Sequence, residues 1–284
     1  MNESAFSNRT GHGQITYDNV VEAANYIKRR LDVKEGVGEV VASIGVICGT
    51  GLGALADQLG NATTIPFTDI PNFPKATALG HKGNIVVGSS GGQRIVCLQG
   101  RYHPYEGYSM QQITLPVRVM HALGVRRIIV TNAAGGLKSH HRMGDFMLIS
   151  DHINLPGLSG MNPLVGPNDE RQTKQCSLSD KAENTMTNID FMFTFRNLPN
   201  FANVYDKNLI QLALDVAKDQ GFLSNVHKGT YCMIFGPMFA TDAEVEYIQQ
   251  KLGADTIGEY VESCCLNTSR LHPRSVYPSQ FEKN

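Results

Sequence analysis

The amino-acid sequence predicts an α/β fold with a mixed, largely parallel β-sheet. Short runs rich in β-formers alternate with stretches of helical apolar periodicity, which is typical of parallel strands covered by helices. Two such runs between residues 84 and 98 follow each other directly and predict an antiparallel hairpin, so we expect a mixed sheet. The 284 residues are enough for one large domain or two small ones.

The elements follow in order along the chain. The first helix is expected at residues 19–31, where Val20, Val21, Ala24 and Ile27 share one face. Strands are expected at residues 44–48, 84–87, 94–98, 127–131, 145–149 and 230–235. Three further helices are expected at residues 110–123, 206–220 and 242–252.

Two segments depart from this alternation. Residues 172–193 are polar at first and lack a clear period, and loops of this length are uncommon inside compact domains, so we predict an inserted surface loop. After Gly258 the chain has few apolar repeats and no helix-length pattern, so residues 259–284 are expected to form a poorly ordered tail. The sequence thus predicts one domain over residues 1–258 with a single insertion.

Composition argues against several classes of function. The net charge is −1 and the pI is about 6.7, without a basic stripe, so we expect no nucleic-acid partner. No apolar run reaches the length of a membrane span, and the N-terminus lacks the pattern of a signal peptide. The six cysteines are scattered, several in apolar runs, which favours buried thiols in a reducing cytoplasm.

A glycine-rich turn, CGTGLG, follows the first predicted strand. Its glycines let the backbone turn tightly, and a helix start together with the Thr50 hydroxyl favours an anion. A plain strand-to-helix turn is an equal alternative for this segment alone. The segment also matches a dinucleotide fingerprint, with Asp69 near the acidic position. We consider the dinucleotide interpretation weaker, because the crossover helix would have too few residues before the next strand and Pro66 interrupts that strand.

Two further segments combine glycine with polar side chains. In GHKG, His81 lies between glycines in what is either a ligand loop or a plain surface turn. In GRYHPYEGY, Arg101 offers a planar fork for phosphate, and His103 can supply a donor or a proton. Tyr105 supplies a flat wall with a hydroxyl. The alternative is that these side chains cap a strand end and pair with Glu106.

Two more segments end strands in small residues. In TNAAGGL a ligand can approach the backbone closely, although a tight turn explains the same residues. After Gly236-Pro237, Phe239 is placed to face a cleft or the core, and Thr241 can cap the next helix. Ligands of open α/β sheets bind beyond the carboxyl ends of strands. Four such ends with glycine and polar or aromatic groups therefore predict a site for a small anion and a ring-shaped ligand.

The motifs CGTGLG, GHKG, GRYHPYEGY, TNAAGGL, GDFMLISDHINLPGLSGMNPLVGPNDER and GTYCMIFGP together resemble trimeric purine nucleoside phosphorylases. The resemblance covers about residues 44–258 in the family's order. It implies a single α/β domain with a mixed, partly barrel-like sheet flanked by helices, and a homotrimer. It also implies phosphorolysis of purine (deoxy)ribonucleosides to base and (deoxy)ribose 1-phosphate in purine salvage. Inorganic phosphate is then the co-substrate, and neither metal nor organic cofactor is needed.

The resemblance also implies residue roles. Tyr105 would pack on the ribose, and Phe239 would stack on the base. The phosphate cradle would consist of Thr50, His81, Arg101, His103 and the backbone amide of Ala133.

The chain departs from the family at several positions. Ala240 replaces a glutamate that hydrogen-bonds the purine, and Glu259-Tyr260-Val261-Glu262 stands where the family has Met-Ser-Thr-Val-Pro-Glu. The family's base-assisting asparagine, ribose-contacting histidine and closing helix have no counterpart. Phe193 or Phe195 could replace a phenylalanine that reaches a neighbouring subunit's site.

Three hypotheses follow. The first is an active phosphorylase with altered base preference. The second is a catalytically impaired relative that binds phosphate or nucleoside without efficient turnover. The third and weaker one is an enzyme that binds a nicotinamide dinucleotide through the residues 49–53.

Overall fold

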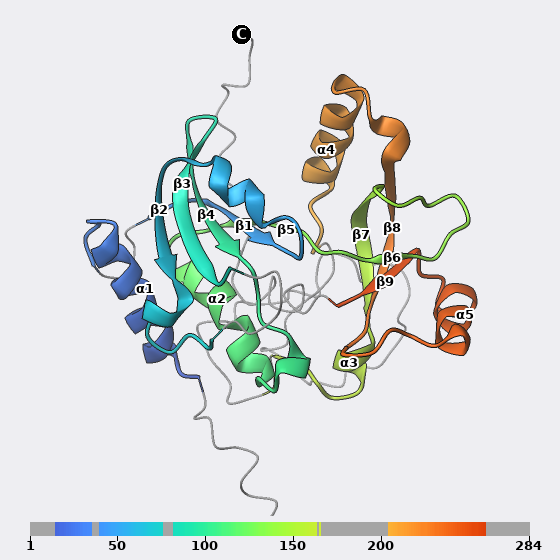
Figure 1. Ribbon diagram of the computed structural model, residues 1–284, viewed down its shortest axis with the longest axis horizontal. Helices are drawn as coiled ribbons and strands as arrows, with labels where there is room; N and C mark the ends of the chain where they lie inside the picture. Colours follow the sequence, from blue (N-terminus) through green and yellow to red (C-terminus); the bar gives the residue numbers. More distant parts are fainter. Residues whose placement is uncertain (1–14, 36–39, 76–81, 164, 166–203, 260–284) are drawn as a thin grey trace, which may run out of the picture.

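The computed structural model describes residues 15–35, 40–75, 82–163, 165 and 204–259. Its strands form a five-stranded sheet in the order β2-β3-β4-β1-β5 and a four-stranded sheet in the order β6-β9-β8-β7 (Figure 1). The first sheet consists of β1 Ile44–Cys48, β2 Gly60–Pro66, β3 Asn84–Ser90, β4 Gln93–Gln99 and β5 Arg127–Val130. The second consists of β6 Gly135–Gly136, β7 Phe146–Asn154, β8 Val226–Met233 and β9 Thr256–Gly258.

Helices flank both sheets. Figure 1 shows α1 and α2 beside the five-stranded sheet, and α4 and α5 beside the four-stranded one. The α-helices are α1 Tyr17–Arg30, α2 Met110–Ala122, α3 Leu155–Leu158, α4 Lys207–Asp219 and α5 Asp242–Gln250. The 3-10 helices are η3 Gly53–Gln58, η4 Phe67–Asp69, η5 Pro104–Glu106 and η8 Leu223–Asn225. Among the described residues, no helix is both long and apolar enough to cross a membrane.

The pairing of the strands confirms the mixed sheet. β1 is parallel to both of its neighbours, so Ile44 lies opposite Ile95 of β4 and Arg127 of β5. β3 and β4 form the predicted antiparallel hairpin, and β2 joins β3 antiparallel at the edge. The strands that follow β5 hydrogen-bond among themselves, with β7, β8 and β9 parallel and β6 antiparallel. They therefore form a second sheet.

One buried cluster contains residues from both sheets. Val20 and Ile27 of α1 pack with Met120 of α2 against the five-stranded sheet, and the same cluster includes Tyr231 and Met233 of β8. The capping residues that the sequence suggests are in place, because the Thr241 hydroxyl accepts from the Glu244 amide at the start of α5.

Several boundaries differ from the predicted ones. β8 begins four residues earlier than expected, and β7 continues to Asn154. β2 forms a full strand, and Pro66 is its last residue, at the sheet edge where a missing N–H is tolerated. The glycine-rich turn leads into the 3-10 helix η3 rather than an α-helix, and β2 does not pair with β1. This argues against the βαβ unit of a dinucleotide site.

Three of the cysteines, Cys48, Cys97 and Cys232, are free and buried, as predicted. The predicted insertion 172–193, the tail beyond Glu259 and the other three cysteines lie outside the described residues. Phe193 and Phe195 lie outside them too.

Candidate active site

Three neighbouring parallel strands bring the predicted anion-binding segments to one edge of the five-stranded sheet. β4 ends at Gln99 beside the end of β1 at Cys48, and β5 ends beside them. The turn after β1 is tied to the segment after β5, because the Gly49 amide donates to the Thr131 hydroxyl at 3.1 Å. A Cβ on Gly49 would lie 2.8 Å from the Asn132 Cα, so only glycine permits this close approach.

Arg101 follows β4 and is buried, with 6% of its surface exposed. Its guanidinium donates from Nη2 to the backbone carbonyl of Glu259 at 2.7 Å. A guanidinium keeps its charge at any physiological pH and presents up to five donors in a fixed plane. Arg101 therefore supplies a buried positive charge at the sheet edge, suited to a phosphate or carboxylate.

His103 is held in one orientation by its neighbours. Oε2 of Glu106 accepts from the His103 amide at 2.7 Å and lies 3.2 Å from Nδ1 of the ring. Both side chains are nearly buried, and the imidazole stacks on Tyr105 with centroids 4.8 Å apart. The pairing with Glu106 matches the capping alternative from the sequence.

Tyr105 is 43% exposed, and its pKa is raised, first by partial burial and then by the carboxylates of Glu259 and Glu106. The other tyrosines of GRYHPYEGY point elsewhere. Tyr102 is buried and donates to the Pro74 carbonyl, and Tyr108 donates to the Lys75 carbonyl, both at 2.7 Å. This motif thus divides its side chains between the sheet edge and the segment that precedes residues 76–81.

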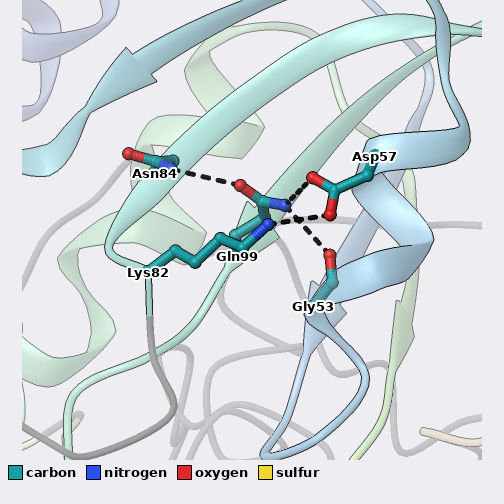
Figure 2. Close-up of polar contacts among 5 residues, drawn as sticks. All are labelled: Gly53, Asp57, Lys82, Asn84 and Gln99. Carbon is teal, nitrogen blue, oxygen red and sulfur yellow. Dashed lines mark hydrogen bonds and ion pairs between the residues drawn. The ribbon is translucent and has the colours of Figure 1, made fainter.

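A polar network fixes the backbone beneath the candidate anion site (Figure 2). Gln99 is buried and donates from Nε2 to the Gly53 carbonyl at 2.9 Å and to Asp57 at 2.7 Å. Its Oε1 accepts from Asn84 at 3.1 Å. Asp57 also pairs with Lys82 at 2.7 Å, which lowers its pKa. The network thus joins the glycine-rich turn to Lys82, which follows His81, and to Gln99, which lies two residues before Arg101.

The other residues predicted to bind phosphate are placed less clearly at this sheet edge. His81 lies outside the described residues. Thr50 is exposed on the turn after β1. Ala133 is exposed after β5, and its carbonyl accepts from the Asn132 amide side chain at 3.1 Å. The structure thus places Thr50, Arg101 and Ala133 after adjacent strands, with His103 two residues beyond Arg101.

The two residues predicted for the base differ from one another. Phe239 is fully exposed at 101%, so among the described residues it contributes nothing to a core. Ala240 is partly buried and packs against a small apolar cluster around Ile248 and Ile257. Phe239 is thus available to a flat ligand, whereas the Ala240 methyl group contacts protein.

Glu259 is a site residue that the sequence did not identify. Besides its carbonyl contact with Arg101, its carboxylate lies against Gly236, where a Cβ would collide with it and would lie 3.0 Å from the Tyr105 ring. Burial raises the pKa of Glu259, and Arg101 opposes that shift. The signal in the sequence was that Glu259 begins the segment that departs from the family pattern.

Known proteins with similar sequences identify the family of this chain. A family model described as the phosphorylase superfamily matches residues 43–259. Purine nucleoside phosphorylase of Anopheles gambiae is 41% identical over 250 residues, which cover 88% of this chain and 62% of that protein. The enzyme of Mus musculus is 40% identical over 245 residues, which cover 86% of this chain and 74% of that protein. The chain thus spans less than two thirds of the mosquito relative's length.

Solved structures are similar over most of this chain. Isoform 2 of purine nucleoside phosphorylase from Schistosoma mansoni, in complex with cytosine and ribose-1-phosphate, has a TM-score of 0.74 at 41% identity. The match covers 89% of this chain and 79% of that one. The Schistosoma mansoni enzyme in complex with inosine gives 0.73 at 38% identity, covering 89% and 78%. The chain therefore belongs to the phosphorylase superfamily and, within it, to the purine nucleoside phosphorylase family.

Proposed function

We propose that this protein catalyses the phosphorolysis of purine (deoxy)ribonucleosides to the free base and (deoxy)ribose 1-phosphate, as a pentosyltransferase of purine salvage. The observation that carries the proposal is that three adjacent parallel strands end at one sheet edge, with Thr50, Arg101 and Ala133 two or three residues beyond their ends. Relatives that bear this activity in their names are about 40% identical over most of this chain.

In this reaction an oxygen of phosphate forms a bond to the anomeric carbon while the bond from that carbon to the base nitrogen breaks. The base leaves with the electron pair and is protonated. The transition state resembles an oxocarbenium ion, so a fixed phosphate both supplies the nucleophile and stabilises positive charge. We assign phosphate binding to Arg101, His103, Thr50, His81 and the backbone amide of Ala133. The buried guanidinium of Arg101 supports this assignment.

The nucleoside is assigned to the same edge. Tyr105 is placed to pack on the ribose, because its ring is partly exposed and stacked on His103. Phe239 offers an exposed aromatic face to the base. Ala240 lacks the polar atoms that reject near-analogues, so we expect weak discrimination among bases. Schistosoma mansoni enzymes have been solved with inosine, adenosine and cytosine.

We further propose a homotrimer in the cytoplasm, with inorganic phosphate as co-substrate and no metal or organic cofactor in the reaction. Light scattering on the purified protein tests the trimer. Activity that survives exhaustive treatment with a chelator tests the independence from metal.

The decisive experiment follows hypoxanthine release from inosine by the purified 284-residue chain, with and without phosphate. We expect release only with phosphate, together with an equal amount of ribose 1-phosphate. Equal release without phosphate indicates a hydrolase and refutes the proposal. If the Arg101→Ala variant releases hypoxanthine at the wild-type rate, the assigned site is refuted but the reaction is not.

A second candidate is a catalytically impaired relative that binds phosphate or nucleoside. The observation that favours it is Glu259, an acidic residue beside Arg101 at the candidate site. The family's serine and asparagine have no counterpart after Glu259, and the loss of one preorganised donor to the transition state lowers the rate by about 10²–10³. Tight phosphate binding in calorimetry, combined with turnover far below about 1 per second, identifies this candidate.

A further inference from the structure

Three histidines lie together at the end of the four-stranded sheet that is remote from α3. His140 and His141 are in the segment that joins β6 to β7, and His227 is the second residue of β8. Figure 1 shows this segment reaching the start of β8. The ring centroids are 4.7 Å apart for His140 and His141, 4.7 Å for His141 and His227, and 5.2 Å for His140 and His227.

The rings surround a common point. One potential ligand nitrogen from each histidine lies within 4.8 Å of the other two. Tetrahedral zinc with Zn–N bonds of about 2.1 Å places its ligand nitrogens roughly 3.4 Å apart. Because His140 is exposed, a small rotation of its side chain can close the difference.

A carboxylate orients one of these rings. Oδ2 of Asp145 lies 2.9 Å from Nε2 of His227. Asp145 is itself fixed, since it accepts from the Arg142 amide at 2.9 Å and from the Asn225 side chain at 3.1 Å. Histidines that bind metals almost always donate their second N–H to such a carboxylate, which fixes the ring and makes it a stronger ligand.

The cluster also borders an open space. A pocket of about 120 Å³ is lined by His141, Asp145 and His227 and extends to Thr256 of β9. The Thr256 side chain is 4% exposed, and its hydroxyl has no hydrogen-bond partner among the described residues.

We propose that His140, His141 and His227 bind one divalent transition-metal ion of the zinc class, with Asp145 as the residue that positions His227. Imidazole nitrogen suits zinc, copper and nickel better than magnesium or calcium. Three protein ligands leave a fourth position toward the pocket, which is the arrangement of an open site. The cluster lies where β7 and β8 begin, whereas Phe239 and Glu259 follow the ends of β8 and β9. The three ligands are therefore remote from Phe239 and Glu259, although the pocket beside them also reaches Asn132 and Ala134, the neighbours of Ala133.

The test uses the full chain, freed of metal by a chelator and titrated with zinc chloride in calorimetry and with cobalt(II) in absorption spectroscopy. We expect one equivalent of each ion, with cobalt d–d bands and no thiolate charge-transfer band. His140→Ala, at an exposed position, should weaken zinc binding by about 100-fold or more, and Asp145→Asn by about 10- to 100-fold. His121→Gln is the matched control, since this histidine lies on α2 outside the cluster.

Three results overturn the proposal. They are the absence of saturable zinc binding, binding unchanged in His140→Ala, and a thiolate band that assigns the ion to cysteine. The melting temperature of metal-free His140→Ala should equal that of metal-free wild type. Zinc at a concentration just above the wild-type Kd should raise the melting temperature of the wild type and of His121→Gln, but not that of His140→Ala.

Discussion

The guanidinium of Arg101 and the backbone carbonyl of Glu259 lie 2.7 Å apart, although the two residues come from the ends of β4 and β9 in different sheets. This hydrogen bond brings an acidic side chain to the candidate phosphate site. The carboxyl group of Glu259 is partly buried near Gly236 and Tyr105, and the segment that carries Tyr105 also carries His103 and Glu106. A phosphate at Arg101 therefore meets a charge that depends on pH.

The first prediction concerns Glu259→Gln. The folded-state pKa of Glu259 is raised, so its carboxyl group is neutral below that pKa and ionised above it. Above the raised pKa the carboxylate repels phosphate, and Glu259→Gln should bind phosphate about tenfold (~1.4 kcal/mol) more tightly. The advantage should vanish as the pH falls and the wild-type carboxyl group protonates. Calorimetric phosphate titrations of both proteins at each pH measure this ratio.

The same shift affects stability. A raised carboxyl pKa stabilises the fold fully below the unfolded-state pKa, and this stabilisation is lost as the pH rises through the folded-state pKa. Glu259→Gln should therefore gain stability over wild type only at the higher pH.

A phosphate-affinity ratio that does not change with pH contradicts the placement of Glu259 at the site.

The second prediction concerns Arg101→Ala. A hydrogen bond to a charged group contributes about 1.5–3 kcal/mol, so phosphate affinity should fall by roughly 10- to 150-fold. Arg94→Ala is the matched control, because Arg94 is exposed near the start of the same strand β4. Unchanged phosphate affinity in Arg101→Ala, measured by calorimetry, rules out this residue as a phosphate ligand.

The third prediction concerns Gln99→Leu. The substitution keeps a similar volume but removes the hydrogen bonds to Gly53, Asp57 and Asn84. The partners left behind are partly or fully exposed, and Asp57 keeps its ion pair with Lys82, so the loss is about that of one ordinary hydrogen bond (~1 kcal/mol) and the melting temperature should fall by a few degrees. The KM for phosphate should rise as well, because the turn with Thr50 loses its anchor.

Gln93→Leu serves as the control, since Gln93 is exposed at the start of β4. A lower melting temperature with an unchanged KM for phosphate means that Gln99 supports the fold alone and does not position the site.

The fourth prediction concerns Phe239→Ala. Stacking of a base on an aromatic ring contributes about 1–3 kcal/mol, so the KM for inosine should rise by roughly 5- to 150-fold. The melting temperature should stay constant, because the side chain is fully exposed. Met238→Ala is the matched control, as this neighbour is 78% exposed. An unchanged KM places the base elsewhere.

Much of the fold and part of the site could be predicted from local patterns. β1, β3, β4 and the helices α1, α2, α4 and α5 carry clear periodicity, and their predicted ranges agree with the structure to within a few residues, whereas the short α3 was not predicted. Arg101 and His103 could be recognised because they directly follow a buried strand. β2 was discounted on account of Pro66, a residue that an edge strand accommodates at its end.

Other parts depend on contacts between distant segments. Gln99 reads as one polar residue at the end of an apolar strand, and its partners Gly53 and Asp57 lie near it only once β1 and β4 have paired. Glu259 was assigned to a poorly ordered tail, yet the pairing of β9 with β8 carries it to Arg101. No local pattern contains either relationship.

The register of β1 sets the order in which this protein can fold. β1 lies between two parallel partners. It can pair only after β4 and β5, which lie far along the chain, have come next to it, so that Ile44 faces Ile95 and Arg127. Parallel pairings of such long sequence separation pay their loop-closure entropy before they gain contacts, and they form slowly. The edge that carries Thr50, Arg101 and Ala133 consequently assembles late, whereas the β3–β4 hairpin can form early. Phosphate binding during refolding should therefore lag behind the appearance of β-structure, and the anion affinity reports the completed chain topology.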